Sequence, residues 1–199
     1  MSLNTCGFIT SVKMAGFIDY LSTMGYLLLI ADSYAVYVIF RLIRGAALQK
    51  EMGVVPLVSG IASLGLALSM SIAWPLPGPF NFIFGDPFMI LSVLLIAAGA
   101  ELLCFGDLKY IEGLAVPAGL IAILYGLVIG IDALDPIYVY GMFILEGLAG
   151  AGAGAAVNTK SKALLWTALI LLVLATALLA VVCVETSFGH VTDFAKYYP

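Results

Sequence analysis

Three acidic residues lie inside long apolar stretches of this sequence, at positions where a charge is costly. Asp32, Glu101 and Glu146 each have mainly aliphatic and aromatic neighbours on both sides. Inside a membrane, carboxyl groups of this kind face the interior of a helix bundle, where they bind and release protons or hold small cations. We therefore expect the three residues to line a polar pathway for protons or small cations. In the alternative interpretation they are structural acids held by hydrogen bonds.

Further polar side chains lie in the same stretches as these acids. The hydroxyl groups of Tyr34 and Tyr37, which follow Asp32 closely, would extend the pathway. Arg41 lies toward the same side of the bilayer as Glu101, and ionisable groups within a membrane usually pair with one another. We expect Arg41 to pair with Glu101.

The sequence lacks the residue patterns of the common catalytic and metal sites. Its one histidine, His190, follows the last apolar stretch, and no Cys-x-x-Cys, His-Glu-x-x-His or Gly-x-Ser-x-Gly motif occurs. We therefore predict no catalytic residue, no metal site and no cofactor. The cysteines Cys6, Cys104 and Cys183 are either three buried thiols or include a disulfide between Cys6 and Cys183.

The composition shows what kind of molecule must position these residues. Only 10% of the 199 residues are charged, against roughly a quarter in ordinary soluble domains. Hydrophobic residues make up 63% of the chain and the mean hydropathy is +1.16, which is more apolar surface than one core of this size can bury. A soluble globular domain and a disordered chain are excluded. A net charge of −4 without a basic block also excludes a nucleic-acid-binding protein.

Stretches of about 20 mostly apolar residues are long enough to span a bilayer as helices. The sequence contains six of them, joined by short loops, so we predict an all-α integral membrane bundle that forms a single domain. Residues 1–23 would be a short helix on the membrane surface or a simple leader, 24–184 the six-helix bundle and 185–199 a tail. The predicted spans cover 24–43, 54–74, 87–105, 110–131, 136–157 and 163–184.

Lysine and arginine residues occur in alternate loops of the predicted bundle. The loops after the first, third and fifth spans are basic, and the loops after the second and fourth contain neither residue. Basic loops remain in the cytoplasm. We therefore predict a multi-pass protein of the cytoplasmic membrane with both termini outside.

Two Asp-Pro pairs predict where helices begin. An acidic cap followed by proline at the first helical position favours a helix start, because the carboxylate accepts free backbone N–H groups and proline has none. We expect Asp86 and Asp135 to cap the third and fifth spans rather than to bind a ligand.

Small residues recur at four-residue spacing on two spans, at 59–71 in the second and at Gly150 and Gly154 in the fifth. Such faces let helices approach closely in lipid. They predict packing within the subunit, contacts to a second copy, or contacts to other membrane subunits. Membrane lipids are the other expected partners, and nucleic acid is not.

The stretch from Trp74 to Pro87 is rich in proline and aromatic residues, and its prolines cannot continue a helix. We expect it to form a rigid apolar cap on the outer membrane surface. Asn81 would either hydrogen-bond backbone groups freed by the prolines or point into the mouth of the bundle. Asp86 would do more than cap a helix if the mouth opens here.

The same stretch resembles the signature of a family of small prokaryotic membrane proteins, the domain of unknown function 981. The resemblance implies a multi-pass membrane fold in a bacterium or archaeon, and it implies no particular activity, substrate or cofactor. The matching positions are Trp74, Pro75, Leu76, Pro77, Gly78, Asn81, Gly85 and Pro87.

Three classes of function fit these observations. The first is a small channel or transporter with Asp32, Glu101 and Glu146 along its pathway. The second is a non-catalytic subunit of a larger membrane complex, with the small-residue faces and the Pro-rich cap as contact surfaces. The third, less favoured, is a membrane-embedded enzyme acting on a lipid or a quinone, since no specific catalytic site is present in the sequence.

Overall fold

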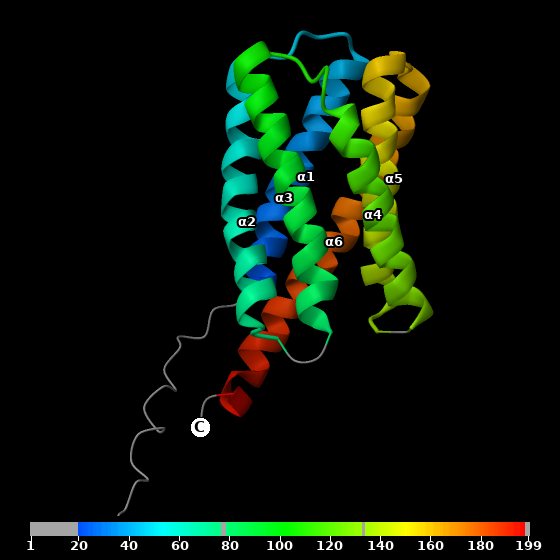
Figure 1. Cartoon of the computed structure of the whole chain (residues 1–199). Helices are drawn as coiled ribbons and strands as arrows, with labels where there is room; N and C mark the ends of the chain where they lie inside the picture. The colour runs from blue at the N-terminus through cyan, green and yellow to red at the C-terminus, as the bar shows by residue number, and fades with distance from the viewer. Residues whose placement is uncertain (1–19, 77–78, 133, 198–199) are drawn as a thin grey trace, which may run out of the picture.

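The computed structural model describes residues 20–76, 79–132 and 134–197, and within them it contains helices and no strand (Figure 1). Six helices are long and apolar enough to cross a membrane, which confirms the prediction of an all-α membrane bundle. The surface helix was expected within residues 1–23, and the structure describes only 20–23 of these, as the first residues of α1. Cys6 also lies outside the described residues. The helices are α1 (Tyr20–Ile43), α2 (Val54–Ala73), α3 (Phe80–Phe105), α4 (Glu112–Ile131), α5 (Ile137–Thr159) and α6 (Lys162–Tyr197), with a short 3-10 helix η1 (Lys50–Gly53) before α2.

The six helices run alternately up and down and form a closed ring. Each helix packs on the next one along the chain, and α6 returns to pack on α1. The first turn of α1 and the last turns of α6 therefore lie at the same end of the bundle, and the loops that contain Arg44, Lys109 and Lys160 lie at the other end (Figure 1). We call the latter the basic end.

Glycines bring α2 against α3 and α4 against α5 at backbone distance. A Cβ atom on Gly53 would collide with the carbonyl oxygen of Gly99, and one on Gly119 with that of Gly147. A Cβ atom on Gly60 would lie 2.9 Å from the carbonyl oxygen of Ser92. These two helix pairs are therefore tight hairpins, whereas the α1–α2 and α3–α4 boundaries are the loosest in the ring.

The small-residue faces are used largely inside the chain. Ser59, Ser63 and Ala67 of α2 are buried. On α5, Gly154 packs against Ala115 of α4, whereas a Cβ atom on Gly150 would meet nothing within 4 Å. The first of the predicted uses, packing within the subunit, thus accounts for most of these positions.

The prediction that α3 begins at Pro87 with Asp86 as its cap is wrong. The helix begins at Phe80, where the N–H groups of Phe82 and Ile83 bond to the carbonyl oxygen of Pro79. Pro87 lies inside the helix and removes one hydrogen bond. The extra turns bury Ile83 and Phe84 almost completely, and this apolar burial outweighs the lost hydrogen bond.

The start of α5 and the end of α6 also differ from the prediction. The cap residue of α5 is Pro136 rather than Asp135, and no side chain caps the helix. At the other end of the chain, α6 continues as a helix through the predicted tail to Tyr197, and its last turns project beyond the other helices (Figure 1). The segment Lys162–Gly189 of this helix is long and apolar enough to cross a membrane.

Candidate functional site

The structure brings two of the three predicted intramembrane acids together. Asp32 on α1 and Glu146 on α5 lie within hydrogen-bonding reach of each other, although 114 residues of sequence separate them. Asp32 is 6% exposed. The Oδ2 atom of Asp32 and the Oε1 atom of Glu146 are buried and have no hydrogen-bond partner among the described residues. We call these two groups the carboxyl pair.

The carboxyl pair has unused capacity to bind a proton or a cation. An ionised carboxylate only accepts hydrogen bonds, so contact between two carboxyl groups is favourable when one of them holds a proton. A buried acceptor without a donor is costly. Two such acceptors beside each other therefore form a site that a proton, a hydrogen-bond donor or a cation would stabilise.

The carboxyl pair borders a cavity of about 190 Å³ near the centre of the bundle. All six helices contribute to this cavity, which we call the chamber, and it extends from the pair to Leu108 and Ile111 at the basic end. Tyr34 is the only other polar side chain in its wall, and the remaining lining residues are aliphatic or glycine. Its volume is enough for several water molecules or a small organic molecule.

A smaller cavity of about 60 Å³ lies beside the chamber at the α3–α4 boundary, and we call it the side cavity. Both cavities are lined by Leu91, Leu94, Glu146 and Gly150. Glu146 thus lies where the two spaces meet, and the loosest part of the ring adjoins the carboxyl pair.

Beyond the carboxyl pair, away from the basic end, the bundle is filled by apolar side chains. We call this group the packed core. It is made of Met24, Leu28, Ala67, Met70, Ile83, Phe84, Phe88, Ile129, Val139, Met142, Phe143, Leu179 and Cys183, all of which are buried.

A third cavity, of about 240 Å³, opens on the far side of the packed core, and we call it the vestibule. Phe84 and Val139 belong both to its wall and to the packed core. Its wall also holds Asp135 and Glu185, and the hydroxyl group of Tyr138 donates a hydrogen bond to Glu185. Glu185 is not among the predicted site residues, because the prediction places it in the tail. The signal that could have identified it is its position one residue after the last predicted span.

Asp135 is a partly desolvated acid at the edge of the vestibule. Its Oδ2 atom is buried without a hydrogen-bond partner among the described residues. Burial raises the pKa of the Asp135 carboxyl above its ordinary value of 3.8. The residue therefore does not have the role of helix cap that the sequence suggested.

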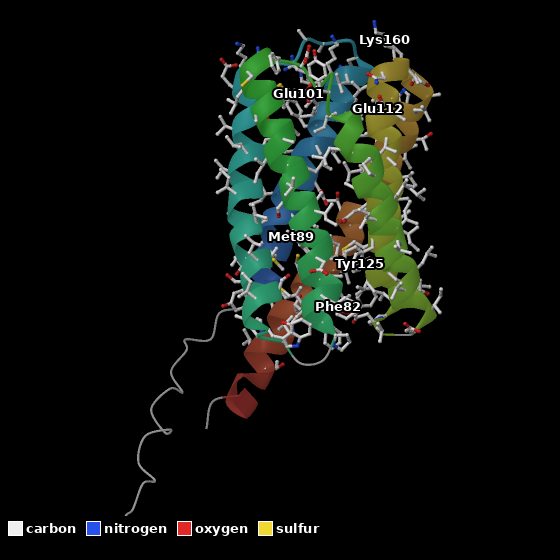
Figure 2. The ribbon with its side chains drawn as sticks, in the orientation of Figure 1. Phe82, Met89, Glu101, Glu112, Tyr125 and Lys160 are labelled. Carbon is white, nitrogen blue, oxygen red and sulfur yellow. The ribbon has the colours of Figure 1, made fainter. Side chains whose placement is uncertain are left out.

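Glu101, the third predicted intramembrane acid, lies at the basic end (Figure 2), and it does not line the chamber that the carboxyl pair borders. It is 8% exposed and accepts a hydrogen bond of 2.5 Å from the backbone N–H of Tyr110. The predicted pair with Arg41 is not formed. Arg41 donates instead to the hydroxyl group of Tyr37, at 3.2 Å, and to the carbonyl oxygen of Ala47, at 2.7 Å.

Glu101 and Arg41 each hold the backbone at a helix end. Glu101 bonds to the loop between α3 and α4, and Arg41 to the loop between α1 and α2. Tyr34 lines the chamber, whereas Tyr37 is 46% exposed, with its ring close to the guanidinium group of Arg41. Of the two tyrosines predicted along the pathway, Tyr34 therefore lines the chamber and Tyr37 does not.

The residues of the Pro-rich stretch have structural contacts. Asn81 is fully buried, and its side chain binds both the N–H group and the carbonyl oxygen of Leu76, at 2.8 and 2.5 Å. Trp74 ends α2 in a left-handed conformation with φ of 50°. Asp86 accepts hydrogen bonds from Ser71 on α2 and from Tyr125 on α4, each at 3.2 Å. Tyr125 is labelled in Figure 2.

Asp86 thus links three helices in the half of the bundle that contains the packed core. Its contact with Tyr125 is a polar bridge across the loose α3–α4 boundary. Among the side chains that the structure describes, no three histidine, cysteine or acidic residues gather as metal ligands. Cys183 is a buried thiol and Cys104 an exposed one.

Comparison with known proteins places the chain in a family. No curated protein and no solved structure matches it. A family model described as a protein of unknown function, DUF981, matches residues 14–193. This match covers nearly the whole chain and confirms the resemblance of the Trp74–Pro87 stretch, and the protein therefore belongs to the DUF981 family of proteins of unknown function.

Proposed function

We propose that the protein is a membrane transporter that moves protons or small cations through the carboxyl pair. The observation that carries this proposal is the meeting of Asp32 and Glu146 at one end of a cavity, each with an unpaired oxygen. An acid inside a membrane costs a few kcal/mol or more. Two buried acids that each have an oxygen without a hydrogen-bond donor destabilise the fold, so a purely structural role does not account for them. They suit a site that protons or other cations occupy in turn.

The arrangement of the cavities favours a transporter over an open channel. The chamber and the vestibule lie on opposite sides of the packed core. A continuous pore would need an unfilled path through this core, whereas a transporter exposes one binding site to the two sides in turn. In this proposal, the cation would reach the carboxyl pair from the basic end, toward which the chamber extends.

The proposed orientation follows from the charges of the loops. The basic end would face the cytoplasm, and the vestibule with Asp135 and Glu185 would face outside. A cation arriving from outside would first meet these two acids, which attract it.

The subunit hypothesis has less support from the geometry. The small-residue faces that suggested contacts to other subunits are largely taken up by packing within the chain. Association with a second copy or with other membrane proteins stays a prediction, which the mass of the detergent-extracted protein by light scattering would test.

The experiment is a proton-flux measurement in proteoliposomes. Wild-type protein is reconstituted with a trapped pH-sensitive dye, and a potassium gradient with valinomycin drives proton movement. We expect Asp32→Asn and Glu146→Gln each to lower the flux about tenfold or more, because each removes a proton-binding group of the pair. Glu101→Gln is the matched control, since Glu101 is 8% exposed against 6% for Asp32 and glutamine keeps an acceptor for the N–H of Tyr110.

Two results would contradict the proposal. One is a flux that stays at the wild-type level in both carboxyl-pair variants. The other is an equal loss in Glu101→Gln, which would show that any buried acid supports the flux through folding alone. Circular dichroism and size-exclusion chromatography of each variant separate loss of function from loss of structure.

A further inference from the structure

We propose that the chamber binds an amphiphilic organic monocation, with its cationic head on the carboxyl pair and its apolar body in the chamber. This inference names a substrate class for the proposed transport function and rests on that function. A proton and the organic cation would compete for the same two carboxyl groups.

The wall of the chamber carries the first argument. A bare metal ion needs several oxygen ligands around it, and among the described residues that line the wall only Asp32, Glu146 and Tyr34 have polar side chains. The rest of the wall is aliphatic, and a cavity of about 190 Å³ is far larger than one bare ion. An apolar body would fill this space and gain the free energy of leaving water.

The charge of the carboxyl pair carries the second argument. When the two groups share one proton, the pair holds one negative charge. A single positive charge neutralises it, whereas an anion would be repelled and a neutral ligand would leave the charge unpaired in a low-dielectric site. The Oδ2 atom of Asp32 is buried without a hydrogen-bond partner among the described residues, and a rotation of this carboxyl group, which borders the chamber, would turn the atom toward such a head group.

The side cavity gives the ligand a route from the membrane. It lies at the loose α3–α4 boundary and is edged by the partly exposed side chains of Ile90 and Ile121. It shares Glu146 and Gly150 with the chamber. An amphiphilic cation dissolved in the bilayer would therefore reach the carboxyl pair along the edge of the packed core, beside Phe88 and Phe143.

The test is calorimetric titration of the full-length protein in nanodiscs of neutral phosphatidylcholine. The probes are tetramethylammonium, butyltrimethylammonium and hexyltrimethylammonium, which carry the same head and increasing apolar length, and empty nanodiscs are the blank. We expect saturable binding with one site per chain. Each added methylene group should tighten binding about fourfold until the chamber is full.

Two glycine variants locate the site independently of the acids. Gly150→Leu places a side chain in the chamber, and Gly65→Leu places the same side chain on the exposed face of α2, and at neither position does a Cβ atom meet anything within 4 Å. We expect Gly150→Leu to weaken hexyltrimethylammonium binding about tenfold or more, and Gly65→Leu to change it less than about twofold. The double variant Asp32→Asn, Glu146→Gln should weaken binding of all probes about tenfold or more, because it removes the single negative charge that either carboxyl group could otherwise hold.

The outcomes separate this inference from the proposed function. Absence of saturable binding in a wild-type protein that still conducts protons would overturn the organic cation as substrate and leave proton transport standing. Binding that is equal in Gly150→Leu and Gly65→Leu would overturn the chamber as the site. Binding that the double variant Asp32→Asn, Glu146→Gln leaves unchanged would overturn the role of the carboxyl pair in holding the head group.

Discussion

At the scale of single residues, the surroundings of each acid decide what it can do. Glu101 receives a backbone N–H group and so stabilises a loop. Asp32 and Glu146 receive no such donor from the described residues and face a cavity. A buried carboxyl group therefore stabilises a loop at the basic end and is available for binding beside the chamber.

Asp135 leads to a prediction about pH. Burial raises the pKa of its carboxyl in the folded state, so the folded protein binds the proton more tightly than the unfolded chain does. Stability is therefore lost as pH rises from the ordinary value of 3.8 through the higher pKa of the folded state. We expect Asp135→Asn to raise the melting temperature at pH 7, with a gain that shrinks toward pH 4, as measured by differential scanning fluorimetry in detergent.

The control for this prediction is Asp107→Asn. Asp107 is exposed, and asparagine keeps an acceptor for the N–H of Lys109. A melting temperature that falls in Asp135→Asn at pH 7 would mean that the ionised carboxylate is stabilised rather than strained by its surroundings.

The sequence identifies the three acids within the spans, but it does not show that Asp32 and Glu146 contact each other. Their depth followed from counting residues within each span, which is why Asp32 and Glu146 were both expected near the middle of the membrane. Their contact depends on how α1 and α5 rotate and pack around α6, which no local pattern specifies. For the same reason Arg41 was matched with Glu101 by depth alone, while its bond to Ala47 comes from the loop geometry.

At the scale of helices, hydropathy predicted the number of spans well and the local capping pattern predicted one start badly. Asp86-Pro87 is a good helix start in isolation. The burial of Ile83 and Phe84 in the packed core depends on the other helices, and it extends α3 to Phe80. Asp86 is then free to bond with Ser71 and Tyr125, which a capping carboxylate would not do.

The glycines of the hairpins lead to a prediction about packing. We expect Gly119→Ala to destabilise the protein by about 2 kcal/mol or more, because its methyl group would collide with the backbone of α5 at Gly147. Gly65→Ala is the control, since its methyl group meets nothing within 4 Å and alanine favours the helix by up to about 1 kcal/mol. Thermal unfolding followed by circular dichroism checks both, and equal melting temperatures would argue against the close α4–α5 contact.

At the scale of the whole molecule, polar and apolar regions alternate along the bundle. The basic end, the chamber, the packed core and the vestibule follow one another, and both described ends of the chain lie on the vestibule side. This polarity suits a protein that has different tasks on the two sides of a membrane.

The orientation leads to a prediction about labelling. In a variant whose native cysteines are replaced by serine, we expect Asp132→Cys to react with a membrane-impermeant maleimide in intact cells. Ala47→Cys, which is exposed in the loop between α1 and α2, should react only after the membrane is permeabilised. The reverse pattern would place the basic end outside and would invert the proposed direction of the chamber.

The unequal packing of the ring has a mechanical consequence. The α2–α3 hairpin is stiff, because glycines hold its two backbones together, and its boundaries with α1 and α4 are the most compliant in the molecule. Deformation is expected to concentrate at those two boundaries, so that the hairpin moves as one rigid body. The helices α1, α5 and α6 stay packed together and keep Asp32 beside Glu146. The carboxyl pair then belongs to the stationary part of the molecule, and the wall opposite it is the part that moves.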